Sequence, residues 1–293
     1  MTPYIIVGVK KDYDLFPFVK YLNKCGIKGE TAVVVLTSSL TNDEEDRKAM
    51  NDVIDANIRS KLITISLVER LEDGIGCDLF LKGDERYTGG TVYHKGERVP
   101  PEELTGGWKE AFDILKGYAK EDTSKPFEVI GEVTLETNLR LLSYLLACSS
   151  QNVPATIILW SGGGNCAFLG PLKVAAEMVP KITTIGIKMV GSTAASIFLF
   201  GTARFLCPGT TYIVHHPRRE GNGKLLAENL ETMVAQLRGI WAVMSTLVFT
   251  KTNITSDILA ENTADGKNWK IGSEDWERLG ITTGDYEEVR DLL

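Results

Sequence analysis

The sequence lacks several features that would place it in a broad class at once. It has no excess of positive charge, because 32 basic residues stand against 39 acidic ones and give a net charge of −7. This balance argues against nucleic acid as a main partner, since basic side chains supply most of that affinity. No run of about 18 consecutive apolar residues occurs, so no membrane span is expected. The first residues also lack the basic start and small-residue cleavage site of a secretory signal.

Cysteine and histidine are scarce as well. The five cysteines are odd in number and scattered, and no Cys-x-x-Cys motif occurs. This usage is typical of reduced thiols in a cytoplasmic protein, most of them small core residues. Only three histidines are present, and no pattern of acidic ligands accompanies them. We therefore expect no metal ion and no cofactor, and His94, which stands alone, is interpreted as structural.

What is present divides the chain into two parts. Residues 1–104 alternate β-branched runs with short helical segments and predict a small α/β domain, whose role the sequence does not reveal. Within it, Gly89-Gly90 between two strand-like runs predicts a β-hairpin. The stretch VPPEELTGG at 99–107 is rich in proline, glycine and acid, and marks a boundary. The second domain is placed at residues 105–293.

Strand and helix patterns alternate throughout the second part, which favours a mostly parallel sheet with helices around it. Two small-residue segments fall where a strand gives way to a helix, namely GGG at 162–164 and GSTAAS at 191–196. Functional sites of α/β folds are built at such strand ends. The glycine loop matches neither a P-loop nor a Gly-x-Gly-x-x-Gly motif, so a nucleotide is disfavoured.

Three polar features lie at these strand ends. Ser196 can expose its hydroxyl near a helix start, or it can be a packing serine bonded to a backbone carbonyl. His215 and His216 end a strand and point to opposite faces, so that one can face a site, or they can be structural. The glycine loop offers bare N–H groups to an anion, or is simply a tight turn. Together, a hydroxyl, an imidazole and amide donors are the components of nucleophilic acyl chemistry.

The order of these segments resembles the Clp protease proteolytic-subunit family, serine peptidases of the crotonase-like fold, over about residues 106–293. IILWSGGGN resembles a strand that ends in Ser-Pro-Gly-Gly, GSTAASIFLFGTARF resembles the serine-bearing segment, and YIVHHP resembles the His-Gln-Pro segment. The run from LLAENL to TKTNIT resembles the long handle helix of that family. The resemblance implies an α/β fold with a spiral of β-β-α units and a handle helix, preceded by the small α/β domain.

Carried over residue by residue, the resemblance makes Ser196 the nucleophile and His215 the general base. It places the oxyanion hole at backbone N–H groups of Gly163, Gly164 and Ile197. The link from Ser196 to His215 is shorter than is usual in the family.

The third catalytic member is displaced. Where the family has an aspartate, the sequence reads ENTADGKNWKIG. The orienting group must accept a hydrogen bond from the histidine Nδ1–H, so Asp265 is the first choice and Asn268 the second. Two further departures are Gly162 in place of the family proline and His216 in place of the glutamine.

The resemblance implies a cytoplasmic serine endopeptidase that cleaves peptides or unfolded proteins through a Ser-His-Asp/Asn site. It also implies a homo-oligomeric ring formed through the handle helix, and an ATP-dependent unfoldase or another regulator as a further partner. Two alternatives stay open. One is a non-catalytic scaffold, which the displaced acid favours. The other is an acyl-CoA hydratase or isomerase on the same fold, against which the Ser–His pair argues.

Overall fold

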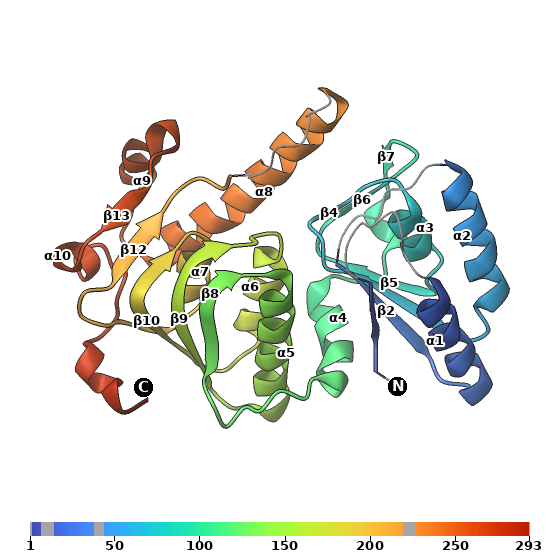
Figure 1. Cartoon of the computed structure of the whole chain (residues 1–293), viewed down its shortest axis with the longest axis horizontal. Coiled ribbons are helices and arrows are strands. Elements are labelled where there is room, and N and C mark those ends of the chain that lie inside the picture. Colours follow the sequence, from blue (N-terminus) through green and yellow to red (C-terminus); the bar gives the residue numbers. More distant parts are fainter. Residues whose placement is uncertain (1, 7–14, 38–43, 219–226, 293) are drawn as a thin grey trace. The chain divides into compact units, whose positions relative to one another are not determined.

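The structure is a computed structural model that describes residues 2–6, 15–37, 44–218 and 227–292, and it divides into two compact units between Tyr118 and Ala119 (Figure 1). This division lies later than the boundary expected at residues 104/105. Helix α4 (Trp108–Leu115) accounts for the difference, because the indole Nε1–H of Trp108 donates to the Ser66 carbonyl at 2.8 Å. A helix with such a contact belongs to the first unit.

The first unit is built on a parallel four-stranded sheet in the order β1-β2-β3-β5. Every residue of β2 and β3 is buried, as expected for central parallel strands covered on both faces. The strands are β1 (Tyr4–Ile6), β2 (Ala32–Leu36), β3 (Leu62–Ser66) and β5 (Glu85–Thr88). The helices besides α4 are α1 (Leu15–Lys28), α2 (Glu44–Asn57) and α3 (Ile75–Leu81).

The hairpin expected at Gly89-Gly90 is not formed, and that prediction is wrong. Strand β6 (Thr91–His94) pairs instead with β4 (Arg70–Leu71) and, antiparallel, with β7 (Glu97–Arg98). The tight turn is Lys95-Gly96, where both residues have positive φ, as a type I′ hairpin turn requires. Glycine is needed at position 90 because the backbone there lies close to Val68. A Cβ at this position would lie 2.4 Å from the Val68 carbonyl oxygen.

The second unit contains a six-stranded sheet in the order β13-β12-β10-β9-β8, with β11 also paired to β10 (Figure 1). All pairs are parallel except that between β12 and β13. The strands are β8 (Phe127–Val133), β9 (Ala155–Gly164), β10 (Ile182–Gly191), β11 (Ala203–Leu206), β12 (Thr211–Val214) and β13 (Trp269–Ile271). The first half of β10 pairs with β11 and the second half with β12, which brings the ends of β9, β10 and β12 to one edge.

Helices alternate with these strands, as the sequence predicts. Helix α5 packs against β8, and α7 packs against β9 and β10. The helices are α5 (Leu135–Gln151), α6 (Leu169–Glu177), α7 (Thr193–Phe198), α8 (Ala227–Lys251), α9 (Ser256–Thr263) and α10 (Ser273–Trp276). In Figure 1, α8 projects beyond the sheet of its own unit.

Helix α8 is apolar over much of its length and poorly covered. The segment Met233–Lys251 is long and apolar enough to cross a membrane by length and composition, although counting consecutive apolar residues predicted no span. Only 17% of its most apolar window is buried within the structure. Val234 and Phe249 are exposed, whereas Met244 and Leu247 are buried. The helix therefore presents an uncovered apolar surface.

Candidate active site

A strained turn joins β10 to α7, and Ser192 occupies it. Its φ of 54° and ψ of −123° lie outside the regions that residues with a side chain normally adopt. Its N–H donates to the Ile213 carbonyl at 3.0 Å, so the pairing of β10 with β12 holds the turn in place. Ser192 is half-buried, unlike the residues that follow it. A serine on a sharp strand-to-helix turn is the arrangement of a nucleophile elbow.

Ser196, the predicted nucleophile, lies one helical turn further on, inside α7. It is 4% exposed, and its N–H donates to the Ser192 carbonyl at 3.2 Å. Ile197, the predicted oxyanion donor, is fully buried in the same helix. Only the first N–H groups of a helix lack an acceptor in the preceding turn, so the N–H of Ile197 is not available to a ligand.

Ser192 is not among the residues predicted from the sequence, although two signals point to it. The predicted strand ITTIGIKMV ends at residue 190, which puts Ser192 rather than Ser196 at the junction with the helix. The link from Ser196 to His215 was short for the family, and starting from Ser192 lengthens it by four residues. Position relative to the strand end and position within the hexapeptide thus point to different serines.

The three glycines predicted as a loop form the last residues of β9, because Gly163 and Gly164 pair with β8, and this glycine segment reaches the same turn. A Cβ on Gly163, whose φ is 106°, would lie 2.5 Å from the Ser192 Cβ, so only glycine permits this approach. The Gly163 N–H donates to the buried Ser161 hydroxyl at 3.0 Å and is therefore already engaged. The Thr193 hydroxyl donates to the Gly164 carbonyl at 2.9 Å. These bonds fix the loop against the turn even though Gly162 stands where the family has proline.

His215 follows β12 at the edge where Ser192 lies, because Gly191 is paired with Ile213. Its Nδ1 is 2.6 Å from the carbonyl oxygen of His216. A carbonyl oxygen can only accept, so Nδ1 carries the hydrogen and Nε2 of the neutral ring is left as an acceptor. Within the described ranges no hydrogen bond joins His215 to Ser192 or to Ser196. Catalytic hydrogen bonds are often long before substrate binds.

Neither candidate for the third member makes a bond to His215 in the part of the chain that the structure covers. Asp265 is exposed, with φ 54°, in the 3-10 turn Ala264–Gly266. The Asn268 side-chain oxygen accepts from Arg218 Nη2 at 2.9 Å, and Arg218 also donates to the Gly266 carbonyl. The pairing of Val214 with Trp269 nevertheless puts Asn268, not Asp265, across from His215 in register.

The His216 side chain points to two helices. Its ring lies on the Trp241 ring of α8, with centroids 3.9 Å apart and planes 33° from parallel. Its Nε2 is 3.3 Å from the hydroxyl oxygen of Thr263 in α9. Burial, with the adjacent His215 as a smaller cause, lowers the pKa of His216. The ring is therefore neutral at pH 7.

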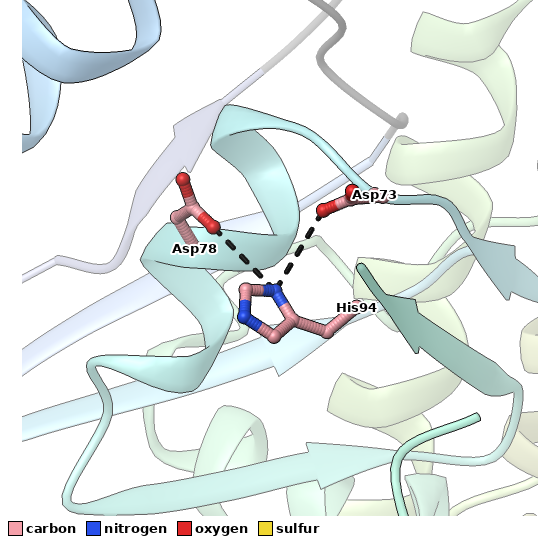
Figure 2. A group of neighbouring side chains, drawn as sticks. All are labelled: Asp73, Asp78 and His94. Atoms are coloured by element: carbon pink, nitrogen blue, oxygen red, sulfur yellow. Dashed lines mark ion pairs between the residues drawn. The ribbon is translucent and has the colours of Figure 1, made fainter. Parts of the chain in front are cut away.

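A second polar cluster lies in the first unit, where Asp73 and Asp78 flank the Nδ1 of His94 at 3.7 Å each (Figure 2). Their ligand atoms lie within 4.8 Å of one another, close enough to hold a metal ion. Arg47, however, donates to both oxygens of Asp78 at 2.6 Å and to Asp73 at 2.8 Å. Burial alone would raise the pKa of Asp78, but bonds from Arg47 and Asn51 outweigh it and lower that pKa. The guanidinium already supplies the cation, which a metal ion would have to displace.

Comparisons with known proteins place these features in one family. A family model described as Clp protease matches residues 122–274, a range that contains the glycine loop, the strained turn and His215. Among solved structures, a point mutant of ClpP1 from Listeria monocytogenes is 19% identical, with a TM-score of 0.48 over 62% of this chain and 99% of that one. No curated protein matches the chain. The matched range lies wholly within the second unit.

Proposed function

Because this chain belongs to the Clp protease family, we propose that its second unit is a serine peptidase in which Ser192, rather than Ser196, is the nucleophile. The observation that carries this assignment is the strained turn at Ser192, which Gly163 approaches so closely that a Cβ on Gly163 would not fit. Strain of this kind costs on the order of 1–3 kcal/mol and persists where the surrounding fold enforces it, most often at functional sites. Ser196, buried in a regular helix, has no such geometry.

The proposed reaction is two successive acyl transfers. The Ser192 hydroxyl attacks the carbonyl carbon of a peptide bond while Nε2 of His215 takes its proton. Backbone N–H groups of Thr193, directly after the nucleophile, and of Gly164 in the glycine loop stabilise the oxyanion, each worth about 3 kcal/mol in such sites. His215 then passes the proton to the leaving amine. Water, activated by the same ring, releases the acyl group from Ser192.

The experiment compares Ser192→Ala with Ser196→Ala, two serines only one helical turn apart. Both are treated with a fluorophosphonate and assayed for cleavage of an unfolded protein such as casein. Ser192→Ala is expected to lose labelling and to lose hydrolysis by a factor on the order of 10⁴–10⁶. Ser196→Ala is expected to keep both. The reverse pattern would identify Ser196 as the nucleophile.

A second candidate function, a non-catalytic scaffold, is favoured by one observation. Asp265 is exposed and Asn268 is bonded to Arg218, so neither carboxylate nor amide reaches the histidine among the described residues. On this hypothesis the unmodified chain would not label and would not cleave casein. The same experiment therefore decides between the two functions.

We also propose that the chain acts as a homo-oligomer on unfolded polypeptides. The support is the uncovered apolar surface of α8. In a single chain, only 17% of the most apolar window of this helix is buried. Exposed apolar surface on this scale is typical of surfaces that bind another protein. A partner that unfolds and delivers substrate is compatible with this family membership and is part of the proposal.

A further inference from the structure

The main-chain carbonyl of His216 lies where a serine peptidase normally places a carboxylate. We propose that His216 is a positioning residue: its carbonyl orients the His215 ring, and its side chain holds that carbonyl in place. The inference rests on the proposed function, since it concerns the same site. Its main test measures the His215 ring directly and does not depend on activity.

The contact itself fixes the state of the His215 ring. Nδ1 and the His216 carbonyl oxygen are 2.6 Å apart, and only Nδ1 can donate. A neutral His215 therefore carries its hydrogen on Nδ1 and presents a lone pair on Nε2, the form that a general base requires. A backbone carbonyl is a recognised partner for this purpose, because the bond made by one ring nitrogen determines the state of the other.

Two side-chain contacts and one backbone restriction hold the His216 carbonyl. The ring rests on Trp241 of α8, and Nε2 meets the fully buried Thr263 hydroxyl of α9 at 3.3 Å. Pro217, which follows, restricts His216 to extended backbone. A carbonyl on such a residue has little freedom to turn away from His215.

Thr263 also determines where the hydrogen of His216 lies. The Thr263 hydroxyl has one hydrogen, which it donates to the Leu259 carbonyl at 2.7 Å. It can therefore only accept from His216, so Nε2 of His216 carries the hydrogen. The two adjacent histidines are thus expected in opposite tautomers, with the hydrogen on Nδ1 in His215 and on Nε2 in His216.

The decisive measurement is a nitrogen–proton correlation spectrum of the full chain labelled with ¹⁵N-histidine. The chain has only three histidines, and the variants His94→Gln and His216→Gln assign the signals. The spectrum is recorded near pH 8, above the ordinary histidine pKa of about 6.5. Opposite tautomers for His215 and His216 are expected. A His215 ring with its hydrogen on Nε2 would overturn the proposal, whether or not the protein is a peptidase.

Variants separate positioning from general stability. Thr263→Val keeps the shape but removes the acceptor, and is expected to give a mixture of His215 tautomers and about a tenfold loss of kcat/KM. Thr263→Ser keeps the hydroxyl and is expected to restore both. A purely structural role would leave the tautomer of His215 unchanged in Thr263→Val, and that result would contradict the proposal.

The acidic alternative is tested with Asp265→Asn. If His216 positions the ring, this change is expected to leave kcat/KM within about twofold. Removing the carboxylate of a true triad in this way costs on the order of 10⁴ in kcat. A loss of that size would assign the orienting role to Asp265 and overturn the proposal.

Discussion

The shape of the candidate site depends on the absence of a side chain at Gly163. A Cβ there would meet the Ser192 Cβ at 2.5 Å and the Gly191 carbonyl oxygen at 2.8 Å, and the φ of 106° disfavours any other residue. The neighbouring Gly162 is less constrained, because its Cβ would meet only the flexible end of Met189 at 3.2 Å. The two neighbouring glycines can therefore be compared directly, because only Gly163 has no room for a side chain.

We predict that Gly163→Ala reduces peptide hydrolysis by a factor on the order of 10²–10³, the effect of losing one oxyanion donor, because the loop must move away from Ser192. The measurements are kcat/KM and the rate of fluorophosphonate labelling. Gly162→Ala serves as the control and is expected to have a much smaller effect. Equal losses in both variants would show that the approach of Gly163 to Ser192 does not matter for the reaction.

At the scale of elements, Arg204 ties β11 to the end of α8 and to the last segment of the chain. Arg204 is 6% exposed, and its guanidinium donates to four backbone carbonyls, each at 2.7–2.9 Å. These belong to Gly201, Lys251, Gly280 and Ile281. Burial lowers the pKa of Arg204, and no carboxylate among the described residues pairs with it. Because one side chain donates to all four carbonyls, the arginine is difficult to replace.

We predict that Arg204→Met lowers the free energy of unfolding by about 3 kcal/mol, because the buried carbonyls of Gly201 and Ile281 lose their bonds to the guanidinium. Urea unfolding followed by circular dichroism measures the change. Arg278→Ala is the control, since Arg278 is exposed and its guanidinium pairs with Asp275 on the surface. Exposed ion pairs are worth at most about 1 kcal/mol, so a small effect is expected there. Similar losses for the two arginines would contradict the interpretation of Arg204.

At the scale of the whole molecule, the chain consists of two compact units, and the family match lies in the second. The first unit has its own parallel sheet and core, and in its polar cluster Arg47 bonds to both carboxylates. The uncovered apolar surface is on α8 of the second unit. Self-association is therefore predicted to depend on the second unit.

We predict that Val234→Glu, on α8, shifts the protein to smaller species in sedimentation velocity, because a buried carboxylate would oppose the contact. Val53→Glu, on α2 of the first unit, is the matched control. The two valines are similarly exposed, at 37% and 39%. An unchanged assembly in Val234→Glu, or an equal effect in Val53→Glu, would show that α8 does not form the oligomer contact.

Much of the fold could be predicted from local patterns. Alternating strand and helix runs gave the α/β architecture, and the glycine loop and the histidine pair were correctly placed at strand ends. The resemblance to the Clp protease family is confirmed by the family match. The false hairpin at Gly89-Gly90 shows the limit of such reasoning. Glycine served there for close approach to the Val68 carbonyl, a contact between two segments far apart in the sequence that turn statistics do not contain.

What the sequence alone determined was the family, the alternation of strands and helices in the second unit, and the short segments from which the candidate site is built. What the tertiary structure decided was which hydroxyl occupies the strand-to-helix turn and which oxygen meets the His215 ring. Ser192, Thr193 and Ser196 can each cap a helix, so the segment 191–196 by itself does not specify where the helix begins. The bond from the Ser192 N–H to the Ile213 carbonyl does, and it exists only because β10 and β12 are paired.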